Sequence, residues 1–270
     1  MMVRLRAASY NTHHGADARD RLDLGRTAET LAALDADVIG LQEVDVHFGA
    51  RSGGVDQAAR LGEMLGMQVA FGAAIDRADA EGGPRHRYGN ALLHRGAIEE
   101  PAMHLLEGHP SLPAMHEPRG VMRARLPIPG GPALTVLVTH LDTGHRGHRA
   151  AQVQGILRLL GELEGPAVLM GDMNNDPAAS EFAALAASGW REAGAEVAGR
   201  ASAGSRLGVL GSLLRAALPT SAARATWPAR FPLRRLDAIW LHGEVRALDL
   251  RVEDSQASDH RPLVATLGLG

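Results

Sequence analysis

A cluster of carboxylate and amide side chains follows an apolar stretch where the chain reads VLMGDMNNDP, from Val168 to Pro177. Asp172 and the alternating polar residues behind it fit the start of an EF-hand calcium loop. Two later positions exclude that loop, because the required Gly is Pro177 and the required bidentate Glu is Ala183. For this segment taken alone a simple turn remains the alternative, since Asn, Asp, Gly and Pro are the usual turn formers.

Other apolar stretches of the chain also end in polar residues. A carboxylate within an apolar stretch is costly unless it is paired or coordinates something. The chain has no Cys, so its potential metal ligands are carboxylate oxygens, amide oxygens and imidazoles. This set is typical of a site for a hard cation such as Mg²⁺ or Mn²⁺ in which His has catalytic roles. The polar residues at these stretch ends are Asn11, Glu43, His140, Asp142, Asp172, Asn174, Asp237, Asp259 and His260.

The elements that must position these residues are mostly strands. Helical spacing of apolar residues occurs at 26–34, 57–65 and 146–163. Because strands outnumber helices and short turns join many of them, an α/β (α+β) fold with mixed sheets covered by helices is favoured over a pure βαβ winding. No short-period repeat or linker is seen, so a single domain over 1–270 is predicted. The predicted strands lie at 3–10, 37–44, 67–75, 89–94, 120–126, 133–141, 167–172, 236–241 and 261–267.

The segment 193–225 is the least strand-like part of the chain and is rich in Ala, Gly, Ser and Arg. Leucines recur at helical spacing between Leu207 and Leu218. This pattern predicts a surface helix packed on the body, with a lid over the site as the alternative.

Composition excludes several classes of protein. Without Cys there are no disulfides and no thiolate sites, and without Lys there is no Walker-type phosphate loop. The net charge of −3 argues against a general nucleic-acid coat protein, although a local basic site is compatible with it. The N-terminus has no signal-peptide pattern and no stretch is long enough for a membrane span. We therefore expect a cytoplasmic monomer without a transmembrane segment.

The ordered motifs SYN, LQEVD, YGNALL, THLD, GDMNNDP, RLDAIWL and SDHRPL resemble the endonuclease/exonuclease/phosphatase superfamily. That superfamily includes DNase I-like nucleases, AP endonucleases, sphingomyelinases, deadenylases and inositol-polyphosphate 5-phosphatases. The resemblance extends from Asn11 to Leu267. It implies a four-layer sandwich, with two mixed sheets packed face to face and helices outside, and a divalent metal, Mg²⁺ or Mn²⁺, at one end.

The resemblance also implies roles for individual residues. Asp172 and Asn174 would position or deprotonate the attacking water and hold the phosphate. His260 would lie beside the scissile phosphate and be oriented by Asp237, while His140 matches a second His of DNase-like and sphingomyelinase-like members. The implied metal-binding residues are Asn11, Glu43 and Asp259.

Three residues are predicted on the substrate side of the site. Asn90 matches a site-lining position of the superfamily, Trp227 is the best candidate for stacking, and Arg234 lies among the Arg residues near the site motifs. The remaining histidines beside the motifs are interpreted as solvent-exposed extras; they are His13, His14, His145 and His148.

The leading hypothesis for function is a metal-dependent phosphodiesterase that hydrolyses a small or lipid-like phosphodiester by in-line attack of an activated water. A nuclease is the first alternative and would need a continuous Arg groove around 140–149 and 230–235. A phosphomonoesterase and a catalytically inactive binding module are weaker alternatives. Met170 and Asp176 depart from the inositol 5-phosphatase pattern, and His140 disfavours the AP endonucleases, which carry Tyr there. The expected partner is a phosphate-ester substrate, with nucleic acid among the candidates.

Overall fold

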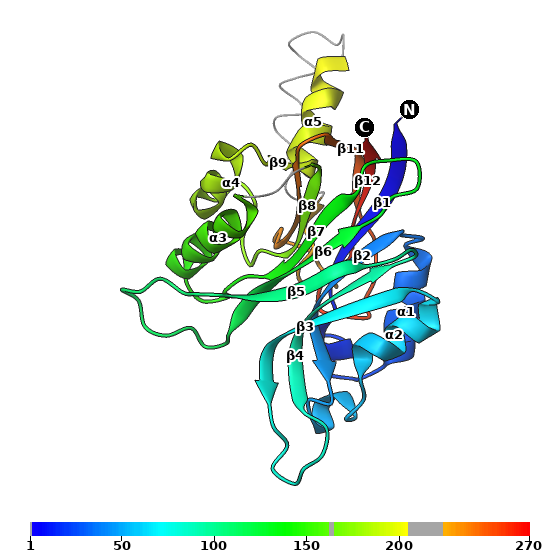
Figure 1. The fold of residues 1–270 in the computed structure, drawn as a ribbon, viewed down its shortest axis with the longest axis vertical. Coiled ribbons are helices and arrows are strands. Elements are labelled where there is room, and N and C mark those ends of the chain that lie inside the picture. Colours follow the sequence, from blue (N-terminus) through cyan, green and yellow to red (C-terminus); the bar gives the residue numbers. More distant parts are fainter. Residues whose placement is uncertain (1, 162–164, 205–223) are drawn as a thin grey trace.

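Two six-stranded mixed sheets form the centre of the molecule in a computed structural model that describes residues 2–161, 165–204 and 224–270 (Figure 1). In the first sheet the strand order is β11-β12-β1-β2-β4-β3, and in the second it is β5-β6-β7-β8-β10-β9. The first sheet contains β1 Val3–Asn11, β2 Val38–Val46, β3 Gln68–Arg77, β4 His86–His94, β11 Val245–Val252 and β12 Leu263–Leu269. The second contains β5 Glu99–Leu106, β6 Arg119–Leu126, β7 Leu134–His140, β8 Ala167–Asp172, β9 Arg191–Glu192 and β10 Asp237–His242.

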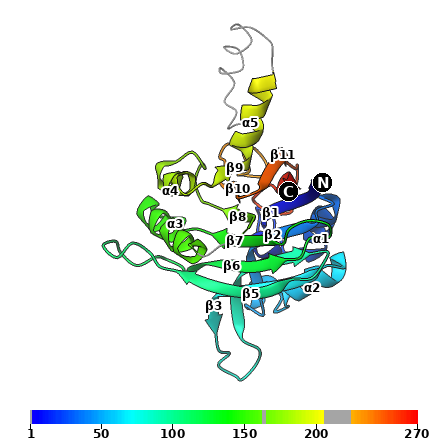
Figure 2. The same cartoon turned by 45° about the horizontal axis from the view of Figure 1, so that its top comes forward.

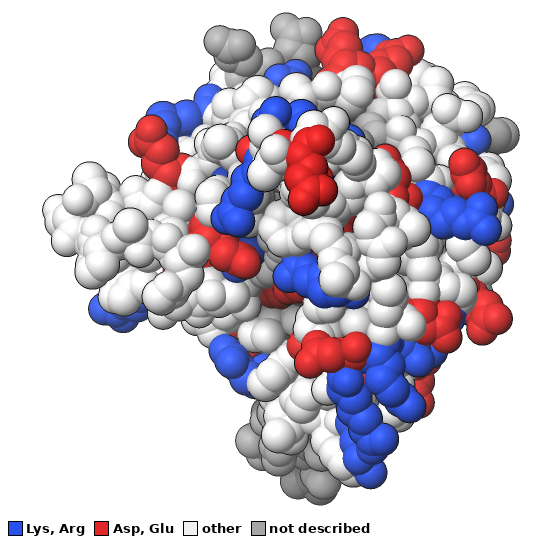
Figure 3. Space-filling model, turned by 90° about the horizontal axis from the view of Figure 1, so that it is seen from below, with Lys and Arg blue, Asp and Glu red and all other residues white. Residues whose placement is uncertain are grey.

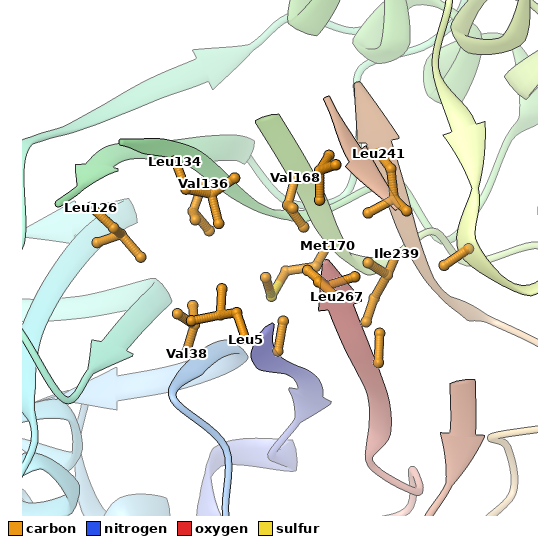
Figure 4. Close-up of a cluster of buried hydrophobic side chains, with 14 of the residues drawn as sticks. Leu5, Val38, Leu126, Leu134, Val136, Val168, Met170, Ile239, Leu241 and Leu267 are labelled. Atoms are coloured by element: carbon orange, nitrogen blue, oxygen red, sulfur yellow. The ribbon is translucent and has the colours of Figure 1, made fainter. Parts of the chain in front are cut away.

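The main core lies between the two sheets, where aliphatic side chains from both inner faces meet (Figure 4). Leu5, Val38 and Leu267 come from the first sheet, and Val168 and Met170 come from the second. The sheets pack closely at Gly40 of β2, where an added Cβ would lie 2.8 Å from the Met170 sulfur. Burial of this apolar surface fixes the distance between the sheets.

Helices cover the outer faces of both sheets (Figure 1). Leu31 of α1 (Leu24–Ala33) and Leu61 of α2 (Gln57–Leu65) belong to a core cluster on the outer side of the first sheet. Val153 of α3 (Arg146–Leu160) and Leu185 of α4 (Ala183–Ala187) belong to the corresponding cluster on the second. The α5 helix (Ala193–Gly204) contacts β9, β10 and β11 and projects from the body (Figure 2).

The predicted four-layer sandwich is confirmed by this architecture. The sequence did not predict β5 or β11; β5 contains Pro101, and both strands have register shifts that interrupt their alternation. The predicted helix between Leu207 and Leu218 lies outside the described residues, and the single-domain assignment stays a prediction. Among the residues that the structure describes, no helix has both the length and the apolar character that a membrane crossing requires.

Candidate active site

Three predicted site residues form a row across neighbouring strands of the second sheet. His140, the last residue of β7, is paired in register with Asp172, the last residue of β8. Asp172 is in turn paired with Asp237, the first residue of β10. Gly171 permits the close approach of β7 and β8, because an added Cβ would lie 1.9 Å from the Thr139 carbonyl oxygen. The two carboxylates are therefore neighbours because of the sheet register.

A β-bulge in the first sheet positions Glu43. Between Leu41 and Val44 the register of β2 shifts against β4, so that Gln42 and Glu43 lie opposite the single residue Asn90. Glu43 adopts a left-handed backbone conformation with a φ of 57°. Bulges commonly redirect a side chain in this way. The Glu43 side chain is consequently available at the end of the sheet rather than in the β2–β4 ladder.

Asn11 connects the two sheets at the site. Its Nδ2 atom donates to Glu43 Oε1 at 3.0 Å and to Asp172 Oδ2 at 3.0 Å. Its Oδ1 atom accepts from the backbone nitrogen of His13 at 3.0 Å. Carboxylates from opposite sheets thus converge on one amide nitrogen.

His260 forms a buried ion pair with both aspartates of the row. Its Nδ1 atom lies 2.9 Å from Asp237 Oδ2, and its Nε2 atom lies 3.5 Å from Asp172 Oδ2. Burial disfavours the imidazolium, but the charges of Asp237 and Asp172 outweigh burial and raise the pKa of His260 to about 10. His260 is therefore a cation at neutral pH.

Asp172 lies at the centre of these contacts and is almost completely buried. Burial raises its pKa, the cationic His260 lowers it, and the nearby Asp237 raises it again, with a resulting pKa of about 6. A carboxyl with this pKa is mostly ionised at neutral pH and can still accept a proton.

His140 has the opposite protonation state from His260. The buried Arg119 donates from Nη1 to His140 Nδ1 at 3.1 Å. Burial, the Arg119 charge and the His260 charge hold the pKa of His140 well below its usual range, so the ring is neutral. Since a guanidinium can only donate, the proton of His140 must be on Nε2, which lies 3.6 Å from Asp172 Oδ2.

Arg119 was missed by the sequence analysis. It lies at the first position of β6, where an Arg is unremarkable in sequence, yet its side chain is only 5% exposed and also pairs with Glu117 at 3.1 Å. Ser258 was missed as well. Its hydroxyl donates to the Asn11 carbonyl at 2.8 Å and accepts from the His260 backbone nitrogen at 3.2 Å, which ties the end of β1 to the segment carrying His260.

The contacts of three other predicted residues are local in space. Asn174 has a left-handed φ of 54°. Its backbone nitrogen donates to Asp172 Oδ1 at 2.8 Å, and its Nδ2 atom donates to the Leu141 carbonyl at 2.9 Å. Trp227 donates from Nε1 to Asp259 Oδ2 at 3.1 Å, which occupies one oxygen of this predicted ligand. The exposed Arg234 packs its guanidinium 5.9 Å from the centre of the Trp227 ring.

Asn90 is buried between the sheets instead of projecting toward solvent. Its Nδ2 atom donates to the carbonyls of Gly120 and Val138, each at 3.2 Å, and it lines a small cavity together with Arg119 and His140. Its side chain therefore links the Glu43 bulge to the second sheet. A direct contact with substrate stays a prediction.

Two of the four histidines predicted to be exposed are buried. His148 accepts from the His109 backbone nitrogen at 2.9 Å, which places its ring beneath the loop before β6. His14 is 9% exposed and lies in the turn that follows β1. The surface interpretation was wrong for these two residues because each follows a site motif whose loop folds back on the body. His145 is exposed and His13 is partly exposed.

The donor chemistry of the centre fits a hard divalent cation. Glu43 and Asp172 approach each other through Asn11, and carboxylate oxygens are the preferred ligands of Mg²⁺ and Mn²⁺. Asp172, Asp237 and His260 also place ligand atoms within 4.8 Å of one another, a spacing compatible with metal binding. A cationic imidazole is not a ligand, however, so the two carboxylates joined by Asn11 are the better candidates. Direct ligation by Asn11, which turns its nitrogen toward them, and by Asp259 stays a prediction.

A comparison with protein-family models bears directly on this site. The model for the endonuclease/exonuclease/phosphatase family matches residues 8–260. The chain belongs to this family. Members of the endonuclease/exonuclease/phosphatase family are hydrolases that act on phosphoester bonds, and they typically depend on divalent metals. A search of the curated proteins found no match.

Solved structures of the endonuclease/exonuclease/phosphatase family share the fold of this chain. A Beutenbergia cavernae endonuclease/exonuclease/phosphatase is 21% identical with a TM-score of 0.76, covering 99% of this chain and 72% of that chain. The human Nocturnin catalytic domain, with a bound sulfate anion, is 21% identical with a TM-score of 0.66 over 100% of this chain and 97% of that chain. A Bacteroides thetaiotaomicron mannosyl-6-phosphatase is 20% identical with a TM-score of 0.62, covering 97% of this chain and 99% of that chain.

Proposed function

We propose that this protein is a divalent-metal-dependent phosphodiesterase that hydrolyses a small phosphodiester by in-line attack of water. The observation that carries this proposal is the arrangement of two imidazoles around Asp172. One, His260, is a cation and the other, His140, is a neutral donor, and both direct Nε2 toward the same carboxylate oxygen. Environments that separate the protonation states of neighbouring groups in this way are characteristic of acid–base sites.

The site residues divide the proposed reaction among them, and Asp172 has two parts in it. Asp172 accepts the proton of the attacking water, and Asn174 helps to hold the phosphate. His260, kept cationic by Asp237, supplies positive charge to the phosphoryl oxygens, while His140 donates a hydrogen bond from Nε2. Glu43 and Asp172, with Asn11 between them, would hold the cation, which supplies Lewis-acid stabilisation of phosphoryl charge when it is bound.

The charge of the centre favours a diester over a monoester. A diester phosphate carries one negative charge, whereas a terminal phosphate carries close to two at neutral pH. His140 is neutral and Arg119 is committed to His140 and Glu117, so His260 is the cationic side chain that directly faces Asp172 among the described residues. One imidazolium and a carboxylate-bound cation match the single negative charge of a diester better than the nearly two charges of a monoester. The mannosyl-6-phosphatase neighbour makes phosphomonoester hydrolysis the alternative to test.

The arginines near the site argue against the nuclease alternative. Arg149 forms a buried ion pair with Glu181 at 2.9 Å, and Arg235 pairs with Glu192, so neither is available to a nucleic-acid backbone. Arg234 and Arg230 are exposed but pack against Trp227 and Phe231 respectively. On the face shown in Figure 3, basic and acidic side chains of the described residues alternate and form no continuous basic band.

A substrate panel tests the proposal. Initial rates would be measured with Mg²⁺ and with Mn²⁺ on bis-p-nitrophenyl phosphate, p-nitrophenyl phosphate, sphingomyelin, RNA, and single-stranded and duplex DNA. The proposal requires the diester to be hydrolysed faster than the monoester of the same leaving group. A higher rate on the monoester would reverse the diester assignment, and a higher rate on DNA or RNA than on any small diester would favour the nuclease. No hydrolysis of any substrate would favour a binding module.

A further inference from the structure

A second group of potential metal ligands lies in the turn that follows β1. His13, His14 and Asp20 each place one ligand atom within 4.8 Å of the others. His13 Nε2 and Asp20 Oδ1 are 3.7 Å apart. Two imidazoles and a carboxylate are a ligand set for borderline first-row cations such as Zn²⁺ and Co²⁺, in contrast to the oxygen ligands at Glu43 and Asp172.

The orientation of His13 is the one that a metal-binding histidine requires. Its Nδ1 atom lies 3.3 Å from the Asp17 carbonyl oxygen. Because a carbonyl can only accept, Nδ1 carries the proton and the lone pair is on Nε2, the atom that faces Asp20. Metal-binding histidines commonly donate their second ring nitrogen to a backbone carbonyl, which fixes the tautomer and the ring orientation.

The surrounding turn holds these ligands in an uncommon backbone conformation. His13, His14 and Asp20 have φ values of 46°, 45° and 56°, although none is Gly. The buried Asp17 carboxylate secures the turn by accepting from the backbone nitrogens of Arg19 and Arg21 and from the Arg21 side chain. Non-Gly residues in the left-handed region persist where the surrounding contacts enforce them, and they gather at functional sites.

We propose that His13, His14 and Asp20 bind one Zn²⁺-like cation, separate from the cation of the carboxylate centre. In a tetrahedral site, ligand atoms bound at about 2.1 Å lie about 3.4 Å apart, so the widest pair must close by at most about 1.4 Å. The Asp20 side chain is 81% exposed and can make that movement, and it also gives the ion access from solvent. Because the His13 backbone nitrogen donates to Asn11 Oδ1, the bound ion would also stiffen the turn that holds Asn11.

The test is a titration of Co²⁺ into the metal-stripped full-length protein in excess Mg²⁺, which occupies the carboxylate centre. Visible absorption and calorimetry would report binding. We expect one Co²⁺ per chain, displaced by Zn²⁺ but not by more Mg²⁺. Asp20→Asn should weaken Co²⁺ binding at least about tenfold while keeping the fold, since Asp20 is exposed. His13→Gln should have the same effect.

Two variants separate this site from the rest of the molecule. Glu43→Gln should leave the Co²⁺ signal unchanged, because it alters only the carboxylate centre. His104→Gln, which removes a histidine from β5, is the matched control and should also bind like the wild type. Equal Co²⁺ binding by the wild type, Asp20→Asn and His13→Gln would overturn the proposal, as would complete competition by Mg²⁺ or an absence of Co²⁺ binding.

Discussion

The Asp237–His260 pair allows the proposed mechanism to be tested by a single substitution, Asp237→Asn. Asn keeps the volume of Asp and retains an oxygen that can accept from His260 Nδ1, so the 2.9 Å contact can persist without its negative charge. The change therefore removes the largest contribution that raises the pKa of His260, while the burial that lowers this pKa remains. The pKa of His260 should fall from about 10 toward or below its ordinary value of 6.5.

The size of the effect follows from the protonated fraction of His260. At pH 8 the wild-type imidazole is almost entirely cationic, whereas an imidazole with a pKa of about 6.5 is only about 3% cationic. If turnover requires the cation, kcat should fall roughly 30-fold at pH 8. At pH 6 about three quarters of the variant would be protonated, so the deficit from charge should be less than about twofold.

The assay is a comparison of pH–rate profiles on bis-p-nitrophenyl phosphate between about pH 5.5 and 9. The wild type should lose activity as the pH falls through about 6, because Asp172 must be ionised to accept the proton of water. Because Asp237 raises and the cationic His260 lowers the pKa of Asp172, the loss of activity at low pH is fitted separately for each enzyme before their rates are compared. Asp249→Asn, at an exposed position of β11, is the matched control. A deficit of equal size at every pH would refute the charge argument, and a raised KM with unchanged kcat would refute the pairing itself.

Three further predictions concern the surroundings of this pair. Arg119→Met should lower kcat about 10- to 100-fold, the size of a lost charge-assisted hydrogen bond, and should raise the pKa of His140 in an NMR titration. Arg123→Met on the same strand is the control, and an unchanged pKa of His140 in Arg119→Met would contradict the assigned contact. Glu43→Gln should weaken Mg²⁺ binding measured by calorimetry with little change in thermal stability, and activity that survives exhaustive EDTA treatment would rule out the metal requirement. Activity on a small diester should depend only weakly on salt, and Arg234→Ala should reduce activity on all substrates alike. Plasmid cleavage suppressed about tenfold by moderate salt would instead support a nuclease.

The sequence predicted the strand ends of the site well because their polar residues interrupt apolar stretches. Asn11 and Asp172 each end a buried strand, and Asp237 begins one, so a local pattern was enough to find them. The order of the motifs then supplied the sandwich fold. The bulge at Glu43 could not be predicted, since it depends on the pairing of β2 with β4, residues that are distant in sequence.

Features that depend on long-range contacts were the ones that the sequence missed or misplaced. Arg119 acts on His140, which is 21 residues away, and nothing in the local sequence indicates that its guanidinium is buried. Asn90 lines a small cavity with Arg119 and His140, but the two hydrogen bonds from its amide nitrogen to carbonyls of the opposite sheet could not be predicted. Whether His14 and His148 are buried is likewise decided by how their loops pack, which periodicity does not report.

The core between the sheets also sets the distance between site residues that come from different sheets. Asn11 and Glu43 belong to the first sheet and Asp172 to the second, so the separation of the two sheets is also a distance within the site. Met170, which packs on Gly40 of the opposite sheet, lies two residues before Asp172 on the same strand. A change of volume at Met170 would therefore alter cation affinity as well as stability. Conversely, a bound cation would draw the sheets together, so that occupancy of the site and compactness of the core should rise and fall in step.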